Sequence, residues 1–270
     1  MIKVDNELIS FDHFNDGACF LKYDAPTSDW HTITWLYDND EELAQLMYLT
    51  RHIRTHMDRT ANLNLLMPYV VNGRQDRVKM ENDVFTLKYF ADFINALKFD
   101  NVMVYDPHSV VSEALFNKLT IIRPHREISE VLDMHPDATI FFPDDGAMKR
   151  YREYTFGRPF GYGVKTRNWE TKEIENLKVV CSDNILYGKD IVIIDDIAGT
   201  GGSIKTAAEQ LKERGANNIY VWVSHCENTI LSPVFNGQSV LDIPELITKL
   251  YTTDSIFTSE HPKIEILRRF

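Results

Sequence analysis

The stretch Asp190-Ile-Val-Ile-Ile-Asp195-Asp196-Ile-Ala-Gly199-Thr-Gly-Gly-Ser203 sets the topology expected for this 270-residue chain. The β-branched run 191–194 is typical of a strand that is buried on both faces. From Ile204, apolar residues recur at helical spacing up to a Gly stop signal at Gly215, which predicts a helix. The apolar run 219–223 predicts the next strand. The quoted stretch therefore ends at the carboxyl edge of a parallel sheet, where ligands bind in open α/β folds.

Glycines, hydroxyls and acids between this strand and helix predict a ribose-phosphate site. Gly201 and Gly202 let the backbone approach a ligand, and N–H groups at a helix start attract phosphate. Asp195 and Asp196 repel phosphate but suit sugar hydroxyls or a metal ion. A simple turn with a helix cap is the structural alternative, and no Walker loop or G-x-G-x-x-G is present. The predicted site comprises Asp195, Asp196, Gly199, Thr200, Gly201, Gly202 and Ser203.

Composition narrows the function classes. A net charge of −11 opposes nonspecific nucleic-acid binding, so we expect no nucleic-acid partner. No apolar run approaches the length of a membrane span, and the first residues lack a signal-peptide pattern, so we expect no membrane partner. Three widely spaced cysteines without C-x-x-C argue against disulfides and cysteine zinc sites, and they predict a reducing, cytoplasmic location.

Strand and helix patterns alternate along the chain and begin again after Pro124. A helical stripe in this pattern carries His52 and His56 at i, i+4, but flanking arginines favour a basic surface over a metal pair. A charged loop is expected over 165–175. We predict an α/β chain of two doubly wound parallel-sheet domains, at 1–122 and 123–270, with the active site between them.

Six loops carry a resemblance to one family. The stretch 190–203 resembles the phosphoribosyl-diphosphate loop of the phosphoribosyltransferase fold. The stretch 68–77, Pro-Tyr-Val-Val-Asn-Gly-Arg-Gln-Asp-Arg, looks like P-Y-x-x-x-x-R-Q-D-[RK] of the ribose-phosphate diphosphokinases, the phosphoribosyl-diphosphate synthetases. Four shorter motifs also resemble motifs of that family, and the six loops follow the family's order along the chain. Phe14-Asn15-Asp16-Gly17 resembles F-[SP]-D-G, and Asp106-Pro107-His108 resembles D-L-H. Residues 143–150 resemble P-D-x-G-x-x-K-R, and Lys165-Thr166-Arg167 resembles K-x-R.

The resemblance implies roles for these residues. It implies an enzyme that transfers the diphosphate of ATP to ribose 5-phosphate with Mg²⁺ as cofactor, in a homodimer or higher homo-oligomer. Lys165 and Arg167 would be catalytic. The ATP-binding residues would be Phe14, Asp16, Arg74, Gln75, Asp76 and His108; the diphosphate residues would be Asp144, Lys149 and Arg150; and the metal residues would be Asp106, His108 and Asp144.

Departures from the family's pattern leave alternatives open. The family carries Asp where this chain has Gly199, and Glu where it has Ala18. The sequence pattern also lacks the family's first strand and helix and its last helix. A larger acceptor such as ADP-ribose, in NAD metabolism, is therefore an alternative to ribose 5-phosphate. A phosphoribosyltransferase and a non-catalytic regulatory subunit are the other two alternatives.

Overall fold

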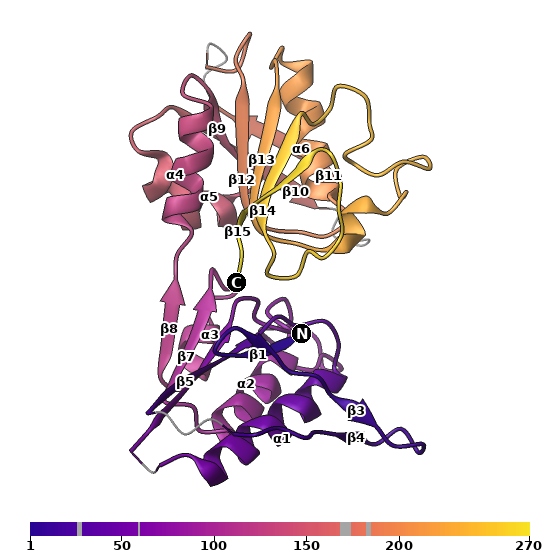
Figure 1. Cartoon of the computed structure of the whole chain (residues 1–270). Coiled ribbons are helices and arrows are strands. Elements are labelled where there is room, and N and C mark those ends of the chain that lie inside the picture. Colours follow the sequence, from indigo (N-terminus) through magenta and orange to yellow (C-terminus); the bar gives the residue numbers. More distant parts are fainter. Residues whose placement is uncertain (26–28, 59, 168–173, 182–184) are drawn as a thin grey trace. The chain divides into compact units, whose positions relative to one another are not determined.

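The computed structural model describes residues 1–25, 29–58, 60–167, 174–181 and 185–270. The chain forms two compact units, which are considered separately here. Unit 1 comprises Met1–Arg123 together with Phe270, and unit 2 comprises Pro124–Arg269 (Figure 1). Phe270 belongs with unit 1 because its ring lies 5.2 Å from that of Tyr105 and its carbonyl oxygen accepts from the Lys3 ammonium.

Unit 1 is built on a mixed six-stranded sheet in the order β2-β1-β5-β6-β7-β8. Strands β5 to β8 are parallel, and β1 pairs antiparallel with both β5 and β2. A separate two-stranded sheet is formed by β3 and β4. The elements are β1 Ile2–Val4, β2 Glu7–Leu8, β3 Asp12–His13, β4 Cys19–Phe20, β5 Trp30–Trp35, α1 Glu41–His56, β6 Asn62–Met67, α2 Thr86–Ala96, β7 Asn101–Tyr105, α3 Ser112–Leu115 and β8 Leu119–Ile122.

Alternate residues of the unit 1 strands form one apolar core. Ile33, Leu65 and Val104 lie in a single cluster with the buried residues of both α1 and α2. Because side chains alternate across a strand, these residues share one face of the sheet, and both long helices cover that face. His52 of α1 bonds the Tyr23 carbonyl at 2.8 Å, so it is partly buried against the chain rather than part of a solvated basic surface.

Unit 2 is built on a seven-stranded sheet in the order β11-β10-β9-β12-β13-β14-β15. The strands are parallel except for β11, which pairs antiparallel with β10. The elements are α4 His125–Met134, β9 Thr139–Phe142, α5 Asp145–Tyr151, the 3₁₀ helix η1 Arg152–Thr155, β10 Phe160–Arg167, β11 Ile174–Val180, β12 Ile191–Ala198, α6 Gly202–Glu213, β13 Ile219–Cys226, η3 Asn228–Leu231, β14 Lys249–Thr253 and β15 Ile264–Arg268.

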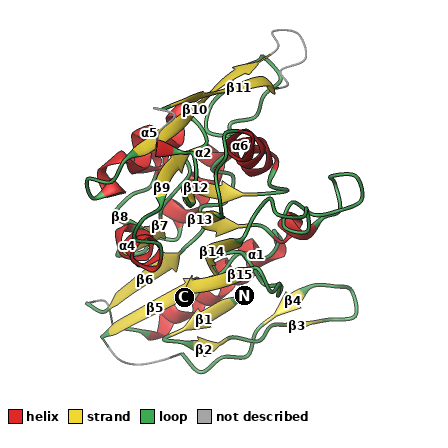
Figure 2. Ribbon diagram, turned by 90° about the horizontal axis from the view of Figure 1, so that it is seen from above, coloured by secondary structure: helices red, strands yellow, loops and turns green. Residues whose placement is uncertain are grey.

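Strand β12 is covered on both faces. Ile191 and Ile193 pack in one cluster with the buried residues of α6. Val192 and Ile194 pack in another with those of α4 and α5. Figure 2 shows α6 on one side of the central strands and α4 and α5 on the other. This arrangement explains why the run 191–194 is apolar at every position rather than at alternate ones.

The predicted α/β organisation is confirmed, since each unit is a largely parallel sheet packed with helices. Strand β12 is longer than the predicted apolar run, because it continues through both aspartates to Ala198. The predicted loop over 165–175 is wrong at its ends: β10 continues to Arg167 and β11 begins at Ile174. Residues 168–173 of that loop lie outside the described ranges. No helix within the described ranges is long and apolar enough to cross a membrane.

The start of α6 generates a stability prediction. Gly201 has φ +85°, and a Cβ there would lie 2.5 Å from Val240 Cγ1 and 3.0 Å from Ile230 Cδ1. Gly201→Ala should therefore destabilise unit 2 by about 1–3 kcal/mol. Gly202 is the matched control, since a Cβ there has no neighbour within 4 Å. Gly202→Ala should be neutral, or stabilising by up to about 1 kcal/mol. Urea unfolding followed by circular dichroism compares the two, and equal midpoints would contradict the close approach at Gly201.

Candidate functional site

The two aspartates of β12 point to opposite faces of the unit 2 sheet. The register with β13 runs from Asp195 opposite Val223 to Ile197 opposite His225, so side chains alternate through this stretch. By this alternation, Asp195 lies on the side of Ile193, which packs with α6, and Asp196 lies on the side of Ile194, which packs with α4 and α5. Asp195 is partly exposed, whereas Asp196 is only 6% exposed. The acid pair is therefore not a symmetrical unit, and only Asp195 lies on the side where α6 begins.

Asp196 makes an ion pair with Arg150. The distance from Asp196 Oδ2 to Arg150 Nη2 is 3.7 Å, and Arg150 comes from the last turn of α5. Since β9 and β12 are neighbouring parallel strands, the loops that follow them open at the same edge of the sheet. The ion pair thus links a predicted diphosphate residue with a predicted ribose residue inside one unit.

The start of α6 has the features of an anion site. Gly201 caps the helix in the left-handed conformation, and its carbonyl oxygen accepts from the Lys205 N–H at 2.8 Å. Thr200 and Gly202 are exposed and Ser203 is partly exposed. The first turn contains no acidic side chain, so the positive end of the helix dipole is not neutralised there by its own residues. The predicted phosphate position at 199–203 is compatible with this geometry.

The charged side chains at the start of α5 already have partners within unit 2. Asp144 caps the helix, and its Oδ1 accepts from the Ala147 N–H at 2.9 Å. Lys149 pairs with Asp145 at 2.5 Å, one helical turn earlier. An anionic ligand at this loop would therefore share or displace the existing partners of Lys149 and Arg150.

Two predicted loops of unit 1 meet after β6 and β7. The Asp76 carboxylate accepts from Arg77 at 2.6 and 2.8 Å and from the Ser109 hydroxyl at 2.6 Å. A Cβ at Gly73 would lie 3.5 Å from His108 Cβ, so the two loops are in close approach. Asp106, which is fully buried and has φ +39°, begins the second loop. The structure thus brings the 73–77 and 106–109 loops together; Ser109, directly after the D-P-H motif, was not predicted.

The contacts of Asp76 lower its pKa to about 2, with the Arg77 hydrogen bond as the largest cause and that of Ser109 as a further one. An unperturbed aspartate has a pKa of about 3.9. Because the pKa is depressed in the folded state, the stabilisation is present above about pH 4 and is lost as the pH falls toward 2. Asp76 is therefore ionised at neutral pH, and it holds Arg77 beside the loop rather than binding phosphate itself.

Two predicted ATP residues are held by local contacts. The Gln75 side chain accepts from the Thr86 hydroxyl, and its backbone oxygen accepts from the Leu87 N–H at 3.3 Å, which fixes the loop against α2. Arg74 is exposed beside it. In the turn between β3 and β4, Asp16 Oδ1 accepts from the Ala18 N–H at 2.9 Å. Phe14 is 58% exposed, with its ring centroid 4.4 Å from that of Phe20.

Lys165 and Arg167 belong to the end of β10. Their backbones pair with those of Leu177 and Ile174 in β11. The two residues are thus on an antiparallel hairpin at the edge of the unit 2 sheet. The sequence placed them in a loop, and the structure extends the strand through them.

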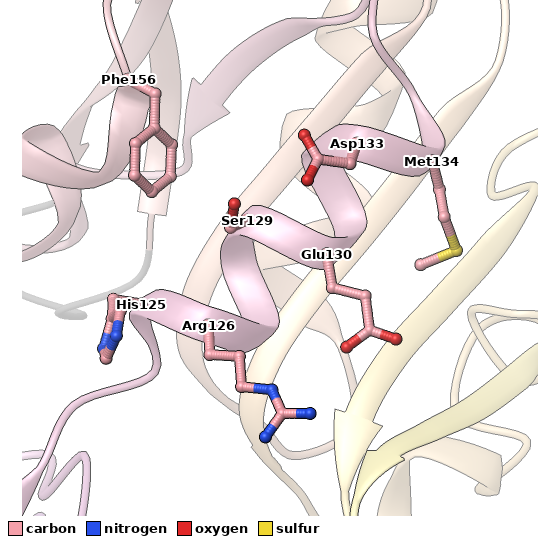
Figure 3. A pocket seen from close by; sticks show the side chains of 7 residues that line it. All are labelled: His125, Arg126, Ser129, Glu130, Asp133, Met134 and Phe156. Atoms are coloured by element: carbon pink, nitrogen blue, oxygen red, sulfur yellow. The ribbon is translucent and has the colours of Figure 1, made fainter.

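A pocket of about 650 Å³ lies elsewhere in unit 2 (Figure 3). None of its residues belongs to the predicted sites. Six of them lie on α4, and nothing in the sequence pattern singled them out as a group. The lining residues are His125, Arg126, Ser129, Glu130, Asp133, Met134 and Phe156.

Known proteins resemble this chain in both sequence and fold. Residues 159–241 match the family model of the phosphoribosyl transferase domain. The ribose-phosphate pyrophosphokinase of Saccharolobus solfataricus is 28% identical over 83% of this chain and 77% of its own length. That of Thermococcus kodakarensis is 28% identical over 93% of this chain and 86% of its own length.

A solved structure extends the match to three dimensions. The phosphoribosylpyrophosphate synthetase of Mycobacterium smegmatis superposes with a TM-score of 0.77, at 18% identity, over 96% of this chain and 85% of that one. The likeness of fold spans both units. Together with the sequence matches, it supports the resemblance carried by the six loops: this chain is similar in sequence and in fold to the ribose-phosphate pyrophosphokinases, which are transferase enzymes.

Proposed function

We propose that this protein transfers the β,γ-diphosphate of ATP to the C1 hydroxyl of ribose 5-phosphate, giving phosphoribosyl diphosphate and AMP. The observation that carries the proposal is the turn between β12 and α6. There a partly exposed aspartate lies on the same face as an open helix start. Such a turn suits a sugar phosphate, with the helix start at the phosphate and the acid at the ribose hydroxyls. The names of the matched relatives support the same reaction.

Asp195 and Asp196 have different roles in this proposal. Asp195, on the α6 face, accepts hydrogen bonds from the ribose hydroxyls. Asp196 is buried and acts through its ion pair with Arg150 at 3.7 Å. That contact holds the guanidinium beside the ribose loop, where it faces the diphosphate that is being transferred. Lys149 adds a second cation from the same helix.

Diphosphate transfer needs in-line positioning and neutralisation of charge more than covalent help. The C1 oxygen forms a bond to the β-phosphorus, and the bond from that phosphorus to the oxygen bridging the α-phosphate breaks to release AMP. Lys165 and Arg167, on β10, stabilise the charge on the transferred group. Arg74 and Gln75 on one loop of unit 1, with His108 on the neighbouring loop, bind ATP, and Asp76 supports this loop through its contacts with Arg77 and Ser109. Phe14 and Asp16, in the turn between β3 and β4, contribute to ATP binding.

Mg²⁺ fits part of the donor set proposed for it. Mg²⁺ prefers one or two carboxylates together with substrate phosphates, so Asp106 and Asp144 are suitable in type. His108 is a less suitable direct ligand, because imidazole favours other metals, and it is better placed as a donor to phosphate or to metal-bound water. When bound, the ion would neutralise charge on the phosphates. Asp144 keeps its helix-capping bond to Ala147 while its carboxylate serves this second purpose.

ADP-ribose is the second candidate acceptor. Gly199 stands where the related loop carries an acid, which removes a negative charge beside the 5-phosphate. The side of Gly202 that a Cβ would occupy has no neighbour within 4 Å, so this edge of the loop is open. An open and less acidic edge can admit a substituent on the phosphate. Free ribose 5-phosphate remains our first choice, because the rest of the loop fits it.

The acceptor assay tests the reaction itself. We expect the protein, with ATP and Mg²⁺, to form AMP at a rate that depends on ribose 5-phosphate, and kcat/KM should be lower for ADP-ribose. A preference for ADP-ribose would overturn our first choice, and Gly199→Asp should then restore the preference for ribose 5-phosphate. Absence of AMP formation with either acceptor would contradict the proposed diphosphate transfer. Consumption of phosphoribosyl diphosphate with a base would instead indicate a phosphoribosyltransferase, and no turnover at all a regulatory subunit.

Charge removal on the β10–β11 hairpin tests the catalytic cations. Lys165→Ala and Arg167→Ala should each lower kcat about 10²-fold or more, since each removes a donor to the charge that develops on the transferred group. Thermal midpoints should change little. Lys178→Ala is the matched control, because Lys178 is an exposed lysine on β11 of the same hairpin and should leave kcat unchanged. A similar loss in all three variants would point to damage of the hairpin rather than of catalysis.

We also propose a homodimer or a higher homo-oligomer, as the resemblance implies. Size-exclusion chromatography with light scattering at assay concentrations should give at least twice the chain mass of 31.3 kDa. A single species at the chain mass, in a fully active sample, would remove this proposal.

A further inference from the structure

The β3–β4 hairpin of unit 1 has little regular structure to support it. Each strand has two residues, and the pair forms its own sheet, outside the six-stranded one. An isolated two-stranded hairpin of this size is at best marginally stable in water. The turn is closed by two backbone bonds between Phe14 and its neighbours: the Phe14 N–H donates to Ala18 O and the Gly17 N–H donates to Phe14 O, both at 2.9 Å.

The register of this hairpin places two metal-ligand types side by side. His13 pairs directly with Cys19 across the two strands. Side chains of a directly opposed pair lie on the same face, with Cβ atoms about 5 Å apart. The imidazole and the thiol therefore approach each other because of strand pairing, although five residues separate them in the sequence.

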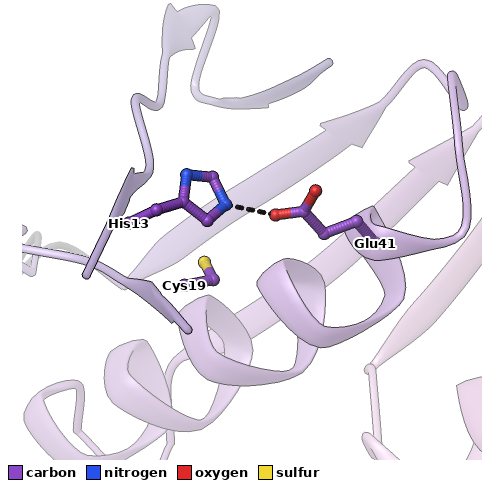
Figure 4. A group of neighbouring side chains, drawn as sticks. All are labelled: His13, Cys19 and Glu41. Atoms are coloured by element: carbon purple, nitrogen blue, oxygen red, sulfur yellow. Dashed lines mark hydrogen bonds and ion pairs between the residues drawn. The ribbon is translucent and has the colours of Figure 1, made fainter. Parts of the chain in front are cut away.

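The first residue of α1 completes the group. His13 Nε2 hydrogen-bonds Glu41 Oε1, and the ligand atoms of His13, Cys19 and Glu41 all lie within 4.8 Å of one another. Figure 4 shows the three side chains converging from β3, β4 and the start of α1. Over the described residues, this is the one group of three His, Cys, Asp or Glu side chains that meets such a distance criterion.

We propose that His13, Cys19 and Glu41 bind one Zn²⁺ ion, with water as the fourth ligand. One nitrogen, one sulfur and one carboxylate oxygen are all donors that zinc accepts in tetrahedral sites. With the usual metal–ligand lengths, tetrahedral ligands lie about 3.3–3.6 Å apart. Side-chain rotation can bring the thiol that much closer. On binding, the Cys19 thiol releases its proton to solvent, and His13 Nε2 exchanges its hydrogen bond to Glu41 for the ion.

Gln45 holds one of these ligands in place. Its amide nitrogen donates to Glu41 Oε1 at 3.3 Å, one helical turn along α1. Residues that orient ligands in this way are a regular feature of metal sites.

The same side-chain types could in principle form a cysteine nucleophile with a histidine base. A nucleophilic cysteine needs a lowered pKa. Burial, followed by the charge of Glu41, raises the pKa of Cys19 instead. A bound Zn²⁺ gives the group a different role, because it fastens the hairpin to α1. Zinc binding rests on these contacts alone and is independent of the proposed enzyme activity.

Cobalt and zinc titrations test the site. Protein stripped with a chelator should bind one equivalent of Zn²⁺ by calorimetry, and Co²⁺ should give a thiolate-to-metal charge-transfer band. Cys19→Ser should abolish the band, and His13→Gln should weaken binding by more than 10-fold. Gln45→Ala should cost about 10-fold. The matched controls are Cys181→Ser, a partly exposed cysteine of unit 2, and His56→Gln, an exposed histidine of α1. Both should bind as the parent chain does.

Hydrogen exchange provides a second measurement that does not depend on the variants. Zn²⁺ should slow deuterium uptake over residues 12–20, and Mg²⁺ at the same concentration should not, because it disfavours sulfur and nitrogen ligands. Absence of the charge-transfer band in the parent chain would overturn the proposal. Zinc binding that survives both Cys19→Ser and His13→Gln would also overturn it, since the ion would then lie elsewhere.

Discussion

The burial of β12 on both faces is the constraint on which unit 2 depends. Side chains 191–194 are at most 1% exposed, so each face of this strand needs a helical layer. Helix α6 covers one face, and α4 and α5 cover the other. Right-handed parallel connections then place the β9–α5 and β12–α6 loops at one edge of the sheet. The Arg150–Asp196 ion pair is a consequence, because two loops distant in sequence open beside each other.

Two of the cations proposed for phosphate binding are already paired with acids of their own unit. Arg150 faces Asp196 and Lys149 faces Asp145, and in unit 1 Arg77, next to the proposed ATP-binding residues, faces Asp76. In a chain of net charge −11, these acids hold the positive groups in position before a polyanion arrives. A bound phosphate can replace the acid in an exposed pair such as Lys149–Asp145 with little loss of folding stability, because such pairs contribute little to it. The buried Asp196 is different, since replacing Arg150 would remove the partner of a buried charge.

The sequence predicted the strands that are apolar along their whole length and the loops that carry family motifs. The start of β12 was predicted from its apolar run, and α6 with its buried stripe, because burial leaves a strong signal in both. Strands β1 and β2 are too short to show a pattern, and the edge strand β11 left no such signal. The Ser109–Asp76 bond joins residues 33 positions apart, and no local pattern encodes that contact. The cysteine spacing argued against a zinc site, because the sequence contains no C-x-x-C motif. The proposed site contains only one cysteine, and strand register, which the spacing of cysteines does not reveal, places it beside His13.

The two aspartates of β12 show how strand geometry refines a motif. In the sequence they form one acidic pair, and either could serve the ribose. In the structure the alternation of the strand separates them, so that Asp195 faces α6 and Asp196 faces α5. The helix start that attracts phosphate belongs to α6, and the cation that Asp196 meets belongs to α5. Of the two adjacent aspartates, Asp195 therefore faces the proposed ligand, and Asp196 pairs with a cation. The two-residue period of a strand is sufficient to explain why the two side chains point in different directions.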